Sequence, residues 1–226
     1  MSIFTQRFFL LPVFIFFIAL NNAVHAQTIP NALDRYYTGR DFENRGRMIE
    51  AESYYDEAVT ICTNEISGNR ATRDTYTALT WSLQRLRRYS DVIIWGERGL
   101  RLYNDEYRIV SIMGEAYFYL DDYELSLNFL QRYANSVPQG ERTSVAYFFI
   151  GEIYRMTGKF RHADIAYTTA VRLEPGLSLW WYRLGSVREA SGEFQLAIEA
   201  YERALRLNPN YREANDGLIR SRRQTG

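Results

Sequence analysis

The sequence predicts an all-α fold in which one helical unit is repeated along the chain. Two observations carry this prediction: the chain matches itself at an offset of 34 residues, and the matching positions have helical spacing. A third observation concerns stability. The 226 residues include one cysteine, so no internal disulfide can form, and a hydrophobic core must stabilise the fold alone.

The 34-residue match is clearest near the C-terminus, where Gly192–Pro209 aligns with Gly158–Pro175. The matching pairs are Gly151/Gly185, Gly158/Gly192, Phe160/Phe194, Ala163/Ala197, Tyr167/Tyr201, Ala170/Ala204, Leu173/Leu207 and Pro175/Pro209. Ala197, Tyr201 and Ala204 are four and three residues apart, so they share one helical face. Pro209 has no backbone N–H and ends that helix. The small alanines allow a neighbouring helix to approach, and glycine at Gly185 allows close contact within the helix pair.

This pattern resembles the tetratricopeptide repeat (TPR), a helix–turn–helix unit of about 34 residues. The register extends over five units, which are residues 32–65, 73–106, 107–140, 144–177 and 178–211. The resemblance implies an all-α, right-handed superhelical solenoid of about five units. Two insertions between units, Ile66–Thr72 and Glu141–Thr143, are expected to be loops.

The second unit departs most from the repeat pattern. Thr80 replaces its first glycine, while Gly96 and Gly99 fall inside its second helix. Each helical glycine costs up to about 1 kcal/mol relative to alanine. We therefore expect this unit to be the least rigid.

The last unit needs a cap, and residues 210–223 are expected to form a capping helix or the start of a sixth unit. Asn210 and Glu213 have the spacing of a capping box. Leu218 and Ile219 are expected to face the last repeat. The arginines of this segment are expected to face water, with contact between the basic cluster at 220–223 and an anionic membrane surface as the alternative; they are Arg212, Arg220, Arg222 and Arg223.

Residues 1–26 have the layout of a secretory signal peptide. Arg7 precedes the 13-residue apolar run Phe8–Leu20, and a cleavage point follows Ala26. A spanning helix needs about 20 apolar residues, although an uncleaved run would still anchor the N-terminus. We therefore expect an exported protein, periplasmic or secreted, whose mature part is a single solenoid domain at 27–226 without a membrane span.

Composition argues against several function classes. Because Arg7 is the single charged residue before Gln27, the mature chain has 26 basic and 27 acidic residues, a net charge of −1. A nucleic-acid binder usually shows a basic excess. His162 is the one mature histidine and Cys62 the one cysteine, and no metal-ligand set, phosphate loop or nucleophile motif is present. We expect no catalysis, no cofactor and no nucleic-acid partner.

The resemblance places binding chemistry on the first helix of each unit, which lines an inner groove in the family. The corresponding positions here hold aromatic, arginine and acidic side chains, and aromatics and arginine are enriched at binding hot spots. The main candidates are Tyr36, Trp81, Arg85, Phe118, Tyr119, Phe148, Glu152, Arg155 and Tyr182. Packing between repeats is the competing explanation for each aromatic.

Three functions fit these expectations. The leading one is an exported, non-catalytic scaffold or adaptor that binds a protein or peptide in the groove, in an envelope complex. The second is a carrier that holds a small apolar or aromatic ligand there. The third is a structural oligomeriser whose contact is the second unit. The partner's identity and the oligomeric state stay open.

Overall fold

The computed structural model describes residues 31–226, which form eleven α-helices and no strand. The predicted signal peptide lies outside the described residues. The helices are α1 (Ala32–Asn44), α2 (Met48–Ser67), α3 (Arg73–Arg85), α4 (Tyr89–Leu102), α5 (Tyr107–Tyr119), α6 (Tyr123–Ser136), α7 (Thr143–Met156), α8 (Phe160–Leu173), α9 (Ser178–Ala190), α10 (Phe194–Leu207) and α11 (Arg212–Thr225). The all-α prediction is confirmed. No helix among these residues is long and apolar enough to cross a membrane.

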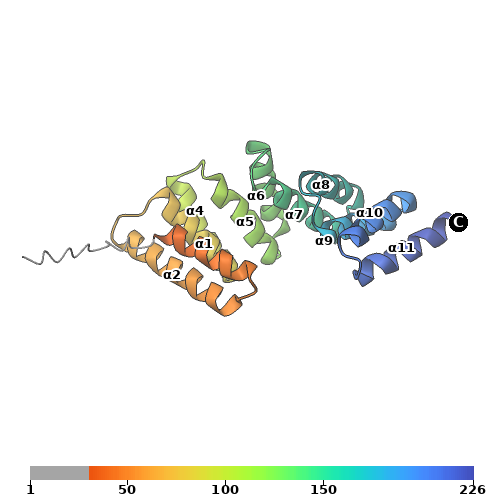
Figure 1. The fold of residues 1–226 in the computed structure, drawn as a ribbon. Coiled ribbons are helices and arrows are strands. Elements are labelled where there is room, and N and C mark those ends of the chain that lie inside the picture. The colour runs from red at the N-terminus through yellow and green to blue at the C-terminus, as the bar shows by residue number, and fades with distance from the viewer. Residues whose placement is uncertain (1–30) are drawn as a thin grey trace, which may run out of the picture.

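The helices form a solenoid of stacked antiparallel pairs. Each helix packs against the next, and the first helices of neighbouring pairs also meet, α1 with α3, α3 with α5, and α5 with α7. Figure 1 shows the described chain running from α1 at one end to α11 at the other. The buried residues accordingly form a series of local clusters along the chain. This arrangement confirms the predicted solenoid.

Close contact between glycine and tyrosine holds the two helices of a pair together. A Cβ added at Gly185 in α9 would lie 2.7 Å from the ring of Tyr201 in α10. Real Cβ atoms essentially never come within 3.0 Å of another heavy atom. The same geometry recurs at Gly151 and Tyr167. The predicted role of Gly185 is therefore confirmed, because no larger residue fits against the buried ring.

The glycines of the second unit have a packing role. A Cβ at Gly96 would lie 2.7 Å from the side chain of Met113, and one at Gly99 would lie 2.9 Å from Ile109. Both glycines are buried in α4 against α5. Their cost in helix propensity is therefore offset by close approach of the next unit, which the sequence interpretation did not include.

The turn inside each unit contains one residue in the left-handed region. Gly46, Gly158 and Gly192 have φ of +73°, +71° and +78°, as glycine readily does. Arg87 and Asp121 adopt φ of +57° and +60° at the equivalent points. A side chain with a Cβ is strained in this region. The turn geometry therefore holds in all five units, although the sequence favours it in only three.

One loop expectation is corrected and the other holds except at Thr143, where α7 begins. The insertion Ile66–Thr72 was expected to be a loop, but α2 continues to Ser67 and Ile66 is buried in the core. The burial of this apolar side chain explains why the helix extends into the insertion. In the second insertion, Arg142 precedes α7 and forms an ion pair with Glu115 of α5.

The start of the last helix also differs from the prediction. Its N-cap is Tyr211, without a side-chain cap, and the predicted Asn210 capping box is not formed. The N–H of Asn210 instead donates to the side chain of Asn208, so a local turn precedes the helix. Leu218 is buried as expected, but Ile219 is 42% exposed. α11 packs against both α9 and α10 and caps the solenoid.

Candidate functional site

All of the predicted site residues lie on the first helices of the units. Tyr36 is on α1; Trp81 and Arg85 on α3; Phe118 and Tyr119 on α5; Phe148, Glu152 and Arg155 on α7; and Tyr182 on α9. Because α1, α3, α5 and α7 pack side by side, their side chains meet across helix boundaries. We call the first helix of each unit its A helix. The surface formed by these nine residues and the side chains they contact is called the A-helix surface.

Its N-terminal part is an aromatic cluster at α1 and α3. Tyr36 is 3% exposed, and its ring centroid lies 5.1 Å from that of Trp81. The guanidinium of Arg108 lies 6.0 Å from the centroid of the half-buried Trp81 ring. Tyr37, which the sequence reasoning did not select, is exposed at the edge of this cluster, 6.4 Å from Trp81. Tyr36 therefore packs between units, while Tyr37 and part of Trp81 remain accessible.

The central part contains the most accessible aromatic among the predicted residues. Tyr119 is 47% exposed and stacks on Tyr89 of α4, with ring centroids 4.5 Å apart and an interplanar angle of 12°. Phe118 is half-buried and contacts the buried Phe149 edge-on at 5.0 Å. This packing restricts the Tyr119 ring, so a ligand that contacts it meets an already ordered surface.

The C-terminal part joins α7 and α9. The half-buried Phe148 stacks on Trp180, with centroids 5.0 Å apart and an interplanar angle of 13°. Tyr182 packs between Tyr201 and Tyr211, at 6.1 and 5.0 Å. Phe148 and Tyr182 therefore contribute mainly to packing between units and expose only part of their rings.

Carboxylates on the A-helix surface connect successive units. Three of them each accept a hydrogen bond from a tyrosine of the same unit and pair with an arginine of the next unit or of α11. Glu43 contacts Tyr55 (2.6 Å) and Arg85 (3.2 Å), Glu152 contacts Tyr167 and Arg183 (3.0 Å to the latter), and Glu189 contacts Tyr201 (2.6 Å) and Arg220 (2.7 Å). These contacts fix how each unit sits on its neighbour.

A fourth carboxylate, Glu115, makes a related contact. It is buried, accepts a hydrogen bond from Gln84 at 2.6 Å, and pairs with Arg142. Burial lowers the pKa of Arg142, but the charge of Glu115 and its hydrogen bond outweigh burial and leave the Arg142 pKa raised. The Arg142 guanidinium is therefore charged, and the contacts of Glu115 with Gln84 and Arg142 connect the second and third units to the start of α7.

The tyrosines of these contacts are held as hydrogen-bond donors. Burial, followed by the nearby carboxylate, raises the pKa of Tyr55, Tyr167 and Tyr201 well above its ordinary value. For Glu189, burial raises the pKa, but hydrogen bonds from Arg220 and Tyr201 outweigh burial and leave it lowered. The carboxylate is therefore ionised at neutral pH.

A pocket of about 400 Å³ opens on this surface between the end of α1 and helices α2, α3, α4 and α5. It is lined by Glu43, Met48, Glu52, Gln84, Arg85, Leu86, Arg87, Tyr89 and Tyr119. Arg85 and Tyr119 are the predicted site residues that it brings together. Its charged and amide side chains can meet the polar groups of a peptide, with Met48 and Tyr119 as apolar contacts.

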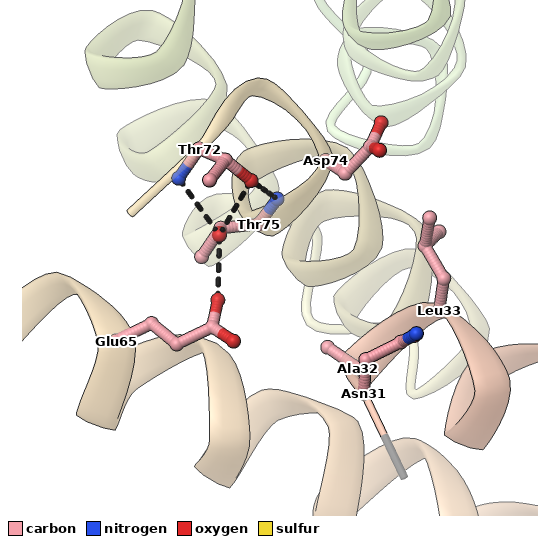
Figure 2. A pocket seen from close by; sticks show the side chains of 7 residues that line it. All are labelled: Asn31, Ala32, Leu33, Glu65, Thr72, Asp74 and Thr75. Atoms are coloured by element: carbon pink, nitrogen blue, oxygen red, sulfur yellow. Dashed lines mark hydrogen bonds between the residues drawn. The ribbon is translucent and has the colours of Figure 1, made fainter. Parts of the chain in front are cut away.

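A smaller pocket of about 210 Å³ lies where α1 and α3 begin, away from the predicted residues. Figure 2 shows Thr75 at its centre, donating to Glu65 (2.6 Å) and accepting from the N–H of Thr72 (2.9 Å). Thr72 and Thr75 form a capping box for α3. These polar groups satisfy one another, so the pocket is explained by helix capping.

The chemistry-bearing residues lie apart from one another. Cys62 is buried, and burial raises its pKa to about 12, so the thiol is protonated at neutral pH. His162 is exposed beside Tyr154, with ring centroids 5.1 Å apart. Within residues 31–226, no group of three His, Cys, Asp or Glu side chains is arranged to hold a metal ion.

Sequence reasoning missed three arginines of this surface. Arg142 lies in an insertion, Arg183 lies outside the groove positions of the repeat, and Arg220 was expected to face water. One signal was available in the sequence. Glu152 and Arg183 are 31 residues apart, as are Glu189 and Arg220, and this offset brings a carboxylate and an arginine of successive units together.

Comparison with known proteins defines the class of fold. The chain has the fold of a helical-repeat solenoid, and family models of the tetratricopeptide repeat match residues 144–176 and 178–211. Those segments are TPR repeats, and their ranges lie within the fourth and fifth units of the sequence register. Comparison with curated protein sequences finds no match.

Solved structures with this fold include several TPR proteins. The chain superposes on a chain of the APC/C hetero-tetramer Cut9–Hcn1 with a TM-score of 0.67 and 18% identity, over 84% of this chain and 36% of that one. It therefore spans little more than a third of that relative. MamA from Desulfovibrio magneticus RS-1 superposes with a TM-score of 0.57 and 18% identity, over 80% of this chain and 97% of that one. YrrB, described as a TPR protein with an unusual peptide-binding site, superposes with a TM-score of 0.54 and 18% identity, over 82% of this chain and 91% of that one. These likenesses concern the fold alone.

Proposed function

We propose that the protein is an exported, non-catalytic TPR scaffold that binds a protein or peptide partner on its A-helix surface, within an envelope complex. The observation that carries the proposal is the exposed Tyr119 ring, held by Tyr89 at the edge of a pocket that also contains the Glu43–Arg85 ion pair. An ordered aromatic beside charged groups matches the composition of binding hot spots.

The TPR fold supports a role in protein interaction. One structural neighbour is part of a hetero-tetramer, and another is described as having a peptide-binding site. Fold likeness at this identity does not transfer a partner. The proposal therefore rests on the side chains of this chain, and the neighbours support only its general class.

Export is part of the proposal and rests on the sequence of residues 1–26. The apolar run Phe8–Leu20 and the small residues before Gln27 fit a cleaved signal. Expression of the full chain, cell fractionation and mass spectrometry of the purified protein test this directly. A mature N-terminus at Gln27 outside the cytoplasm is expected, whereas an intact Met1 in the cytoplasmic fraction contradicts export.

The alternative, a carrier of a small apolar ligand, has less support. Pockets that hold such ligands are mainly apolar. The pocket beside Tyr119 is lined by Glu43, Glu52, Arg85 and Arg87, so it is poorly suited to an apolar molecule. Native mass spectrometry that detects a co-purifying apolar compound would favour the carrier.

A site-specific crosslinking experiment tests partner binding. A photoreactive amino acid replaces Tyr119 in one variant and Ile165 in a matched control, where Ile165 is 67% exposed on α8, away from the A-helix surface. A discrete crosslinked protein is expected from position 119 and not from position 165. Equal crosslinking at the two positions, or none in the native host, contradicts binding on the A-helix surface.

Partner recovery in a point variant gives a second readout. Tyr119→Ala removes an exposed ring and leaves the core intact, so it is preferable to Phe148→Ala, whose ring packs on Trp180. Loss of a hot-spot aromatic typically costs about 2 kcal/mol or more of binding free energy. We expect recovery of the crosslinked partner to fall in Tyr119→Ala and not in Ile165→Ala.

A further inference from the structure

One carboxylate of the A-helix surface is shared by two arginines. Glu152 is 7% exposed; its Oε2 accepts from Nη2 of Arg155 at 2.9 Å, and its Oε1 lies 3.0 Å from Nε of Arg183. Within residues 31–226, no other carboxylate lies within 4.0 Å of either guanidinium. Arg155 and Arg183 together carry two positive charges, and Glu152 balances only one of them.

The other carboxylates of this surface are balanced. Each has one arginine within ion-pair distance: Glu43 with Arg85, Glu115 with Arg142, and Glu189 with Arg220. The excess charge at Glu152 is thus local to the joint between α7 and α9. A half-buried positive charge is less well solvated than one on an open surface, which favours a compensating anion.

The two guanidiniums have donors to spare. Within the described part of the chain, neither terminal nitrogen of Arg183 has a hydrogen-bond acceptor, and Arg155 uses only Nη2. Both side chains are about a third exposed, at 28% and 30%, whereas the Nε atom of each is buried and makes no hydrogen bond within the described chain. The planar fork of a guanidinium matches a carboxylate in a two-bond geometry.

Exposed apolar side chains lie close to the two arginines in the sequence. Met156 follows Arg155 at the end of α7, and Leu179 lies four residues before Arg183 on the same face of α9; both are exposed. The guanidinium of Arg183 also lies 5.7 Å from the ring centroid of Tyr182. The A-helix surface continues in both directions, to Tyr119 and to Tyr182, so an extended ligand can pass through this point.

We propose that the partner segment places an internal aspartate or glutamate side chain between Arg155 and Arg183, with an adjacent apolar residue over Met156 or Leu179. This inference rests on the proposed function, because it names the chemistry of the segment that the A-helix surface recognises. The charge balance argues for an acidic side chain, and the continuation of the surface on both sides argues for an internal residue.

The test uses two small probes that differ only in charge. N-acetylglutamic acid α-amide carries a side-chain carboxylate, whereas N-acetylglutamine amide is its neutral counterpart. The exported protein, purified from cells that express the full chain, is titrated while NMR follows the side-chain Nε–H signals of its arginines. Saturable shifts of Arg155 and Arg183 are expected with the charged probe only. Equal shifts with both probes overturn the proposal.

Variants assign the site. Arg183→Gln is expected to weaken binding of the charged probe about tenfold, which is equivalent to about 1.4 kcal/mol of binding free energy. Arg206→Gln is the matched control, because Arg206 is exposed on α10, outside the A-helix surface, and no carboxylate of the described chain lies within ion-pair distance of it; the affinity of this variant for the charged probe should be unchanged. Glu152→Gln removes the competing carboxylate and should tighten binding. Unchanged affinity in Arg183→Gln, with circular dichroism showing a folded protein, contradicts the assignment.

Two outcomes separate this inference from the proposed function. If crosslinking through position 119 captures a partner that Arg183→Gln binds as well as the parent does, the scaffold proposal stands and the acidic-residue inference fails. A peptide whose one carboxylate is its C-terminus, bound as tightly as the glutamate probe, overturns the choice of an internal residue.

Discussion

Glu189 and Arg220 join the last repeat to the capping helix through two hydrogen bonds, at 2.7 and 3.0 Å. Tyr201 donates to the same carboxylate at 2.6 Å. The arrangement repeats at Glu152, which contacts Tyr167 and Arg183. A tyrosine of one unit and an arginine of the next thus share a carboxylate, so the stability of each joint depends on an ionised group.

Acid should weaken the joint at Glu189. Because its folded pKa is lowered, its contribution is complete above the unfolded pKa of about 4.3 and is lost as pH falls through the folded value. We expect Arg220→Gln to cost about 0.5–1 kcal/mol at pH 7, since Arg220 is mostly exposed. Urea unfolding at pH 7 and pH 3 should show a smaller difference from the parent at pH 3.

The control for that experiment is Arg222→Gln. Arg222 pairs with Glu202 at 2.8 Å, but no buried tyrosine shares this exposed carboxylate. Its effect should be near zero at both pH values. If Arg220→Gln and Arg222→Gln have the same effect at every pH, the joint at Glu189 has no special role.

Removing one hydroxyl should destabilise the fourth unit. Tyr167→Phe deletes the hydrogen bond to Oε1 of the buried Glu152 and leaves that oxygen with only the Arg183 ion pair. A loss of about 1–3 kcal/mol is expected from chemical unfolding. Tyr154→Phe is the matched control, because its hydroxyl accepts only a 3.4 Å bond from Gln131 at the surface. A Tyr167→Phe protein as stable as the control contradicts the assigned role.

The glycine–tyrosine contact predicts a second stability effect. Gly185→Ala places a methyl group 2.7 Å from the Tyr201 ring, which is fully buried and cannot move aside. Overpacking of this kind costs about 1–3 kcal/mol. Gly176→Ala meets nothing within 4 Å and should change stability by less than about 0.5 kcal/mol. Thermal unfolding followed by circular dichroism compares the two variants.

Relief of strain at a turn should stabilise the protein. Arg87 adopts φ +57°, where a side chain costs roughly 1–2 kcal/mol relative to glycine. Arg87→Gly is therefore expected to raise the unfolding free energy by about 1 kcal/mol. Gly192→Ala, at the equivalent turn with φ +78°, should lower it by a similar amount. Opposite signs in a denaturant titration support the turn geometry, and a destabilised Arg87→Gly protein contradicts it.

Much of the architecture could be predicted from the sequence because the same packing positions recur in each repeat unit. Gly185, Tyr201 and Pro209 each have counterparts 34 residues earlier, and periodic packing requires such counterparts. Departures from the pattern could not be interpreted in the same way. Gly96 and Gly99 read as weak points of a helix, yet they are contact points with Met113 and Ile109. Propensity describes one helix, whereas this contact depends on its neighbour.

The candidate binding surface was likewise predictable from the sequence only in part. The sequence by itself determined the all-α repeat, the first helices as the place for binding chemistry, and a set of aromatic and charged candidates on them. Only the tertiary structure decided that Tyr36 is buried, that Tyr119 is exposed and ordered, and that Arg155 and Arg183 share one carboxylate. The physical reason is that helical periodicity specifies which face a residue occupies. Exposure and charge balance depend on side chains contributed by other units.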